Sequence, residues 1–479
     1  MVRILKRLNR RQFIGAVGAG AVAAGCGADG VVGTIDPVDP IDLTGGGPEL
    51  PTTVGPGPVE PVDPVDPVDP VDPGPTLPAN YRATFLQRVT FGPTRAEQQR
   101  FDQIGHEAFL EEQLNPESID DSNTGIGDLL APLWTLSATP DELMTTRWPD
   151  SWVSAMPHHA RAKMIYAIKS RRQLYERMVD FWSDHFNIHP VTTYVRFQNI
   201  RFQQQVIRPH AMGNFRDLLF AVAKSPAMME YLDNQVNYAN AMNENYAREL
   251  LELHTVGLNN GYSHQDIVET ARAFTGWRAV AQAGTDVFNF EFRAGYHDNG
   301  AKYIMGLPLQ AGGGITDGER VLDFLASHPN TATFIATKLL LYFVTDTPTS
   351  SMIDRVSTAF YESDGDIRTT LRALLSVDIL QHAKPRLRRP FEMVVNVLRR
   401  TGATIDSTKS IEEILRPMGH YPYDWSTPDG YPIRESHWAG GFLERWNFAF
   451  GLAKGLINGI TLPTSAALGP SVAPSREQV

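Results

Sequence analysis

Residues 160–188 read ARAKMIYAIKSRRQLYERMVDFWSDHFNI, and their apolar side chains recur almost without interruption at the spacing of an α-helix. This stretch predicts a buried helical segment that ends before Pro190, because the residue before a proline disfavours helical geometry. Similar periodic segments lie on both sides of it, at residues 84–100, 243–256, 264–275, 321–327, 331–344, 366–375, 390–400 and 441–455. The predicted fold class is therefore all-α, with one large multi-helical domain.

Residues at the ends of these segments support the assignment. Ser263 and Asp266 have the spacing of a capping box, in which two side chains satisfy the first free backbone N–H groups of a helix. Thr316 and Glu319 repeat that spacing. Gly257 stands where a glycine commonly ends a helix. We expect a helix beginning at each capping box and one ending at Gly257.

One segment departs from helical periodicity. Phe288–Phe292 alternates apolar and polar residues with the period of a strand. Its expected partner is residues 303–306, across the loop that contains His297 and Asp298. The sequence therefore predicts one small β-hairpin near residues 287–306.

Residues 1–25 have the organisation of an export signal. Arg10 and Arg11 form a twin-arginine pattern, and the uncharged run that follows is too short to span a bilayer as a stable helix. The run ends in Ala-Ala-Gly before Cys26, the single cysteine of the chain. We expect export by the twin-arginine machinery and lipidation of Cys26, giving a periplasmic or cell-surface lipoprotein held at the membrane by its lipid. The alternative is ordinary cleavage after a small residue.

Residues 26–78 read as a spacer that precedes the helical domain at residues 79–455. The triplet Pro-Val-Asp repeats through residues 61–73, which favours an extended polyproline II chain whose aspartates repel one another. Without aromatic residues the segment cannot build a core. A proline-rich ligand for a partner domain is the alternative. Residues 456–479 are expected to form a flexible C-terminal tail.

The composition excludes several classes of protein. From residue 79 onward acidic and basic residues nearly balance, so no basic field is available for a phosphate backbone, and nucleic acid is not an expected partner. A single cysteine excludes an internal disulfide and any multi-cysteine zinc or iron–sulfur site. The sequence also lacks the Gly-x-Ser-x-Gly, Walker and His-Glu-x-x-His motifs.

The first of three polar clusters lies in residues 180–189. His185 and His189 are four residues apart and would share one face of a helix. Two imidazoles at this spacing bind a divalent metal when a further ligand comes from elsewhere, so both are candidate metal ligands. The alternative is two hydrogen-bonded histidines near a helix end.

The second cluster lies in residues 244–254, where one polar stripe of the predicted helix faces away from His254. On this stripe Glu249 and Glu252 are candidate catalytic carboxylates, and Asn245 and Arg248 are candidate binding residues. A solvated face with an ion pair between Arg248 and Glu252 is the alternative.

The third cluster lies in the loop at residues 296–302. His297 beside Asp298 offers a base with a neighbouring carboxylate, so both are candidate catalytic residues, and Lys302 adds a cation for binding. Asn-Gly in the same loop is also a simple turn signal. If the three clusters act together, one concavity is expected to be lined by five side chains: His185, Asn245, Glu249, Glu252 and His297.

Six motifs, in this order, resemble those of the bacterial domain-of-unknown-function family 1800. They are Arg88-Val-Thr-Phe-Gly-Pro-Thr94, Met178-Val-Asp-Phe-Trp-Ser-Asp-His-Phe-Asn187, Glu244-Asn-Tyr-Ala-Arg-Glu-Leu-Leu-Glu-Leu-His-Thr255, Ala273-Phe-Thr-Gly-Trp277, His297-Asp-x-Gly-x-Lys302 and His328-Pro329. The resemblance covers about residue 80 to about residue 450 and implies an exported, mainly helical protein. It supplies no established reaction, and Asp184 stands where asparagine is expected in many relatives.

Two functions remain open at this point, and the sequence does not decide whether the chain is an enzyme. The favoured one is an extracytoplasmic hydrolase, metal-assisted or not, that acts on a polymer or an ester. The other is a non-catalytic surface binding or envelope-assembly protein with a polysaccharide or an envelope protein as partner. The aromatic loop at residues 421–431, with Trp425 as a candidate binding residue, suits stacking on a sugar, or packs as a lid over the core.

The first prediction concerns the anchor. Cys26→Ala removes the only thiol that can carry a lipid, so the exported protein should move from the washed membrane fraction to the soluble fraction. The control, Arg10→Lys with Arg11→Lys, should block export itself. Retention of the Cys26→Ala protein in washed membranes would show that something other than this lipid holds the chain.

Overall fold

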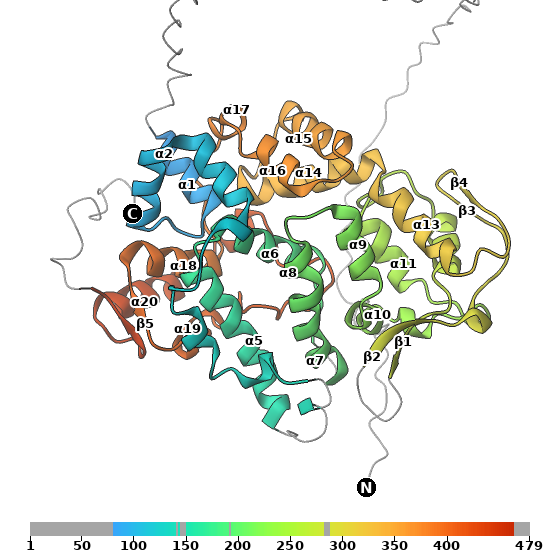
Figure 1. Cartoon of the computed structure of the whole chain (residues 1–479), viewed down its shortest axis with the longest axis horizontal. Coiled ribbons are helices and arrows are strands. Elements are labelled where there is room, and N and C mark those ends of the chain that lie inside the picture. Colours follow the sequence, from blue (N-terminus) through green and yellow to red (C-terminus); the bar gives the residue numbers. More distant parts are fainter. Residues whose placement is uncertain (1–79, 140–141, 144–149, 191–192, 282–287, 464–479) are drawn as a thin grey trace, which may run out of the picture. The chain divides into compact units, whose positions relative to one another are not determined.

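The computed structural model describes residues 80–139, 142–143, 150–190, 193–281 and 288–463, all within one compact unit (Figure 1). The predicted export signal, Cys26 and the spacer lie outside the described residues, as do residues 464–479. Across the described ranges, no helix combines the length and hydropathy needed to cross a bilayer.

The fold is all-α, as predicted. The helices are α1 (Tyr81–Val89), α2 (Arg95–Leu114), α3 (Ile126–Leu130), α5 (Asp150–Lys169), α6 (Gln173–His185), α7 (Thr193–Arg201), α8 (Arg208–His210), α9 (Phe215–Ala223), α10 (Pro226–Tyr231), α11 (Asn245–Glu249), α12 (His264–Ala273), α13 (Ile315–Ala326), α14 (Pro329–Phe343), α15 (Ser350–Glu362), α16 (Ile367–Leu374), α17 (Val377–Leu380), α18 (Pro390–Thr401), α19 (Lys409–Leu415) and α20 (Phe442–Ala453). Two π-helical segments, η4 (Phe202–Ile207) and η6 (Leu250–His254), continue α7 and α11.

The stretch 160–188 forms parts of two helices instead of one. The break between α5 and α6 is stabilised by Gln173, whose side-chain amide donates hydrogen bonds to the carbonyls of Ala167 (3.1 Å) and Ser170 (2.8 Å). These are carbonyl groups that the end of a helix leaves free. The Gln173 side-chain oxygen also accepts a hydrogen bond from the Phe91 backbone N–H at 2.9 Å. The apolar periodicity of residues 160–188 does not predict this break, because it carries no information about polar capping contacts.

The capping predictions have mixed outcomes. The box formed by Ser263 and Asp266 is confirmed at the start of α12. The box predicted for Thr316 is wrong, because α13 begins at Ile315 after Gly314, and the Thr316 hydroxyl donates to the Gly313 carbonyl at 2.8 Å. Gly257 follows the π-helical segment with a left-handed φ of 93°, as expected of a residue that ends a helix.

Three two-stranded antiparallel sheets are present in the described part of the chain: β1 (Trp277–Ala281) with β2 (Phe288–Phe292), β3 (Lys302–Ile304) with β4 (Leu307–Leu309), and β5 (Thr404–Ile405) with β6 (Ile460–Thr461). The strand β2 is confirmed, but its expected pairing with residues 303–306 is wrong. Met305 and Gly306 have positive φ, so the chain turns back there and β3 pairs with β4. Because β6 lies beyond residue 455, the ordered body extends into the predicted tail.

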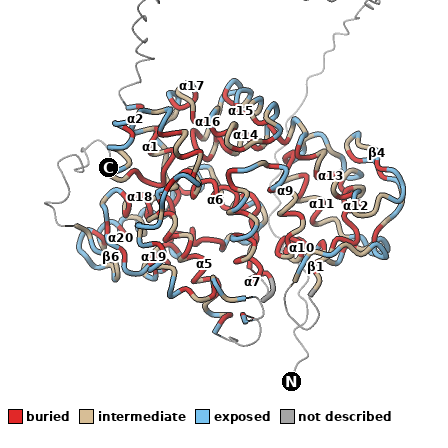
Figure 2. Tube along the Cα trace, viewed as in Figure 1, coloured by how far each residue is buried: buried red, intermediate tan, exposed pale blue. Residues whose placement is uncertain are grey.

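Helix α6 is the most deeply buried part of the body (Figure 2). Eleven of its 13 residues are buried, and it contacts α1, α2, α5 and the π-helical segment η4. A second core lies between α5, α18, α19 and α20. Helix α6 belongs to the first core, and its Asp180 is joined by ion pairs to Lys163 of α5 and to Arg389, which directly precedes α18.

The turn after α1 is fixed against α18 by close backbone packing. Asn396 donates its side-chain amide to the Phe91 carbonyl at 2.9 Å, and Arg399 Nε donates to the Gly92 carbonyl at 2.8 Å. A Cβ atom at Gly92 would lie 2.8 Å from the Asn396 Cα, closer than side chains pack. Glycine at this position is therefore required by the approach of two backbones.

This contact yields the second prediction. Gly92→Ala should lower the free energy of unfolding by about 1–3 kcal/mol, the cost typical of overpacking a core. Urea denaturation measures it. In the control Gly127→Ala, the added Cβ meets nothing within 4 Å inside α3, and the change should stabilise the protein by roughly 0.5–1 kcal/mol. Equal urea midpoints for Gly92→Ala and the parent would refute the packing argument.

Candidate functional site

The carboxyl end of α6 opens into a cavity of about 470 Å³. Helix α14 and residues 429–437 complete its walls. Its apolar lining includes Phe181, Leu253, Phe334, Leu341 and Ile433. Its polar lining includes Asp184, His185, Lys338, Asp429 and His437. A mostly apolar pocket with a few converging polar groups is the usual form of a small-molecule site.

His185 and Lys338 form a hydrogen-bonded pair in this cavity. Lys338 Nζ donates to His185 Nδ1 at 2.9 Å, and His185 Nε2 donates to the backbone carbonyl of His254 at 3.1 Å. Burial, together with the positive charge of Lys338, lowers the pKa of His185 well below its usual value, so the imidazole is neutral. Burial also lowers the pKa of Lys338 to about 8, although the charges of Asp184 and Asp429 oppose the shift.

Two carboxylates one helical turn apart on α6 have different environments. Asp180 accepts hydrogen bonds from Arg389 Nη2 (2.6 Å) and the Tyr342 hydroxyl (2.7 Å), and its Oδ1 lies 2.6 Å from Lys163 Nζ. Although burial raises its pKa, the charges of Lys163 and Arg389 hold the pKa of Asp180 far below its usual range. Asp184 accepts from Arg389 Nη1 at 2.7 Å, and burial and the charge of Asp180 raise its pKa to about 6. Asp184 is therefore the carboxyl group able to exchange a proton near neutral pH.

The aromatic loop covers the end of α6 as a lid. Asn187 donates its side-chain amide to the carbonyls of Trp425 (2.9 Å) and Thr427 (2.7 Å). A Cβ at Gly430 would clash with the Asp184 carbonyl, so only glycine permits this approach. Trp425 is half-buried, and its indole N–H donates to Asp429 Oδ1 at 3.1 Å, which orients that carboxylate. Of the two arrangements considered for the loop, the packed lid is the one observed.

The segment of the second cluster reaches this cavity only through Leu253, and Asn245, Glu249 and Glu252 are not among the residues that line it. Asn245, Arg248, Glu249 and Glu252 are partly buried, whereas His254 is fully buried, so the predicted facing is confirmed. Arg248 pairs with Glu252 at 3.5 Å, and Leu253 of the π-helical segment lines the cavity. Burial, Glu252 and the charge of Asp429 raise the pKa of Glu249 to about 7. Glu249, the last residue of α11 before the π-helical segment, is thus a second carboxyl group that titrates near neutrality.

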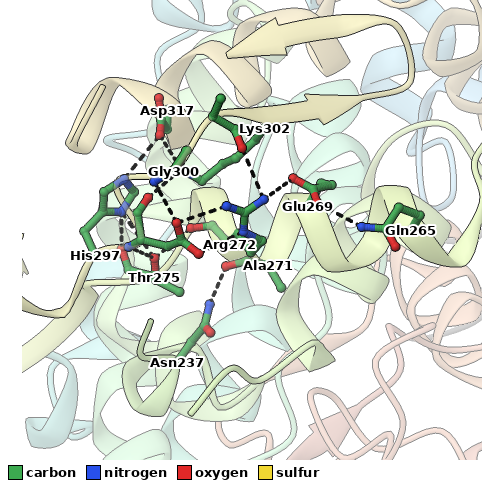
Figure 3. Close-up of polar contacts among 12 residues, drawn as sticks. Asn237, Gln265, Glu269, Ala271, Arg272, Thr275, His297, Gly300, Lys302 and Asp317 are labelled. Carbon is green, nitrogen blue, oxygen red and sulfur yellow. Dashed lines mark hydrogen bonds and ion pairs between the residues drawn. The ribbon is translucent and has the colours of Figure 1, made fainter. Parts of the chain in front are cut away.

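The third cluster forms a separate buried network (Figure 3). Lys302 donates to the carbonyls of Asp298 (2.5 Å) and Gly300 (2.9 Å) and to Asp317 Oδ2 (2.7 Å), and His297 Nε2 lies 3.2 Å from the same Asp317 oxygen. The predicted concavity lined by His185, Asn245, Glu249, Glu252 and His297 is corrected, because only His185 of these five lines the cavity. All three hydrogens of the Lys302 ammonium are donated in these bonds, which attach the loop before β3 to α13.

Asp298 has a structural partner of its own. Arg272 of α12 donates through Nε to Asp298 Oδ2 at 2.8 Å and through Nη2 to Oδ1 at 3.1 Å. The hydrogen bond and charge of Arg272 lower the pKa of Asp298 to about 2. A carboxylate held this way in a bidentate pair is a poor base. The interaction instead fastens the loop to α12.

The predicted pairing of His185 and His189 on one helix face is also corrected. Helix α6 ends at His185, and His189 lies beyond it, with Nε2 3.5 Å from Asp424. Within the described ranges, no three His, Cys, Asp or Glu side chains gather closely enough to hold a metal ion. The helix stops early because Asn187 turns to the lid and residue 190 is proline.

The sequence reasoning missed Lys338, although a signal was present. Lys338 is the only charged residue in the apolar helix α14, whose sequence is PNTATFIATKLLLYF. A lone charge at a core-facing position requires a buried partner, and such groups concentrate at functional sites. The six quoted motifs do not contain it.

The fold and the cavity together define a large all-α protein with a charged network buried beneath a small lidded pocket. The family described as "Protein of unknown function (DUF1800)" matches residues 84–478, so the chain belongs to this family, which confirms the resemblance carried by its motifs. No curated protein matches the chain, and no solved structure does.

Glu249 supplies the third prediction. Its pKa is raised from 4.5 to about 7 in the folded state, so folding binds a proton there between these values. The contribution of Glu249 to stability therefore falls as pH rises through that window and is most unfavourable above it. Glu249→Gln should melt at a higher temperature than the parent above about pH 7, and the difference should vanish below pH 4.5.

The matched control is Glu244→Gln in the same segment. Glu244 pairs with Arg248 at 3.3 Å on the partly exposed side, so its replacement should not raise the melting temperature. Thermal melts of the three proteins across pH give the comparison. A Glu249→Gln protein that melts below the parent at every pH would identify Glu249 as a structural group.

Proposed function

We propose that this protein is a hydrolase that acts outside the cytoplasm on an ester with an apolar acyl group. The observation that carries the proposal is that Asp184 and Lys338 line one cavity while their pKa values lie near neutrality, at about 6 and about 8. Around neutral pH the carboxyl group is ionised and the amine is protonated. The cavity thus offers a general base and a general acid at the same time.

The proposed reaction divides the work between these two groups. The Asp184 carboxylate removes a proton from a water molecule, which attacks the ester carbonyl carbon. The Lys338 ammonium stabilises the negative charge on the carbonyl oxygen and then donates a proton to the departing alkoxide, so that a carboxylic acid and an alcohol leave. His185 is a positioning residue, because its neutral Nδ1 accepts a hydrogen bond from Lys338 and fixes the direction of the ammonium group.

The lining of the cavity favours an acyl group over a sugar. Phe181, Phe334 and Leu341 supply apolar wall, and Tyr431, which also lines the cavity, is buried like Tyr421 and Trp438. Stacking on a polysaccharide requires exposed aromatic faces. The burial of these three rings supports an ester substrate over a polysaccharide.

We further propose that the protein works as an exported lipoprotein. The support is entirely in the sequence: Arg10 and Arg11 before an uncharged run, and Cys26 after small residues. The twin-arginine machinery, the partner expected for export, carries proteins already folded, which suits a body with so many buried ion pairs. The acidic, proline-rich spacer would then hold the catalytic body away from the membrane surface.

The fourth prediction is the pH dependence of hydrolysis of a soluble ester, p-nitrophenyl butyrate. The rate should rise as Asp184 ionises near pH 6 and fall as Lys338 loses its proton near pH 8, giving a bell-shaped profile. Asp184→Asn and Lys338→Met should each lower kcat by roughly 10²-fold or more, the usual contribution of one acid or base.

The control is Lys454→Met, which removes an exposed lysine after α20 and should leave the rate and the profile unchanged. Circular dichroism establishes that each variant is folded. If folded Asp184→Asn and Lys338→Met proteins hydrolyse the ester as fast as the parent, or if none of the proteins hydrolyses it, the proposed reaction is wrong.

A further inference from the structure

A second cavity, of about 340 Å³, lies between α3, α5 and the π-helical segment η4. Tyr423, from the opposite side of the same aromatic loop that forms the lid, lines this cavity, with its ring stacked on His159 at 4.2 Å between ring centroids. None of the side chains assigned above to catalysis lines it. It is therefore a different site from the cavity at the end of α6.

The charges that face this cavity all have one sign. Lys163 and Arg208 line it, together with the polar side chains of His159, Tyr166 and Gln203, and among the described residues no aspartate or glutamate does. The side chain of Lys163 is 9% exposed and that of Arg208 is 21% exposed. Both cations are therefore built into the wall.

The carboxylates that balance these cations lie behind the wall, on α6. Lys163 Nζ is 2.6 Å from Asp180 Oδ1, and Arg208 donates to both oxygens of Glu176 at 3.0 and 2.6 Å. Burial and the positive charges of Lys163 and Arg208 lower the pKa of His159 to about 3. A negative charge in the cavity would lie closer to the two cations than to their carboxylate partners. Its attraction to the cations would therefore exceed its repulsion from the carboxylates.

The same cavity also has an apolar lining. Leu130, Leu133, Leu136 and Ala162 contribute to it. The cations thus suit an anionic head, and the leucines suit a short hydrocarbon chain. We propose that this cavity binds a small amphiphilic anion, an aliphatic carboxylate, independently of the reaction proposed for the first cavity.

Gly127 provides a test that leaves the charged network intact. It lines the cavity from α3, and a Cβ atom there meets nothing within 4 Å, so a side chain can begin at this position without a clash. Gly127→Asp places a carboxylate against the cavity, where it repels an anionic ligand and competes with it. Gly127→Asn has nearly the same size and no charge, and is the matched control.

The measurement is isothermal titration calorimetry of hexanoate, with hexanol as the uncharged ligand, on the full exported chain. Hexanoate should bind the parent and Gly127→Asn at one saturable site, hexanol should bind more weakly, and Gly127→Asp should weaken hexanoate binding by about tenfold or more. Circular dichroism establishes that both variants are folded.

Three results would overturn the proposal. The first is no saturable hexanoate binding to the parent. The second is hexanol binding as tightly as hexanoate, which would make the site merely apolar. The third is Gly127→Asp binding hexanoate as the parent does, which would place the anion elsewhere. None of these results depends on ester hydrolysis, so the two proposals fail separately.

Discussion

The contact between Arg389 and the end of α6 is the interaction on which the rest of the structure depends. Arg389 is 1% exposed and binds Asp180 at 2.6 Å and Asp184 at 2.7 Å, while Glu392 lies 3.2 Å away on the same helix. Lys163 from α5 and Tyr342 from α14 complete the environment of Asp180. Four helices are thereby joined at one group of charges. Removing one member of such a buried set leaves a charge without a partner, which typically costs about 3–5 kcal/mol.

This arrangement also explains why two aspartates of one helix behave differently. Asp180 contacts two cations and a tyrosine hydroxyl and stays ionised. Asp184 contacts only Arg389, which also binds Asp180, and the negative charge of Asp180 raises the pKa of Asp184. Asp180 therefore stabilises the fold, whereas Asp184 has a raised pKa and lines the cavity.

The sequence was sufficient for features that depend on neighbours along the chain. Period and capping residues located α12, α14 and α18, and the facing of Glu249 and His254 followed from helical geometry. It was insufficient where the partner is remote. His297 was predicted to be catalytic and Lys302 to be a binding cation, because nothing in the local sequence showed that both would contact Asp317. Similarly, the pairing of His185 and His189 failed because the lid, more than 200 residues away, draws Asn187 out of the helix. A long-range polar contact leaves at most a lone charge in an apolar helix, as at Lys338, and the local sequence does not identify its partner.

The same ion pairs reach both cavities. Lys163 stands in the wall of the second cavity and Asp184 in the wall of the first, and each contact in the series Lys163–Asp180–Arg389–Asp184 is no longer than 2.7 Å. In a buried site, a charge added at one end of such a series is weakly screened at the other. An anion beside Lys163 would make the surroundings of Asp184 more negative and raise the pKa of Asp184 further. By reciprocity, protonation of Asp184 would strengthen binding of the anion by the same factor. If both proposals hold, the buried network that holds α5, α6, α14 and α18 together would therefore couple anion binding in the second cavity to the protonation of Asp184 in the first.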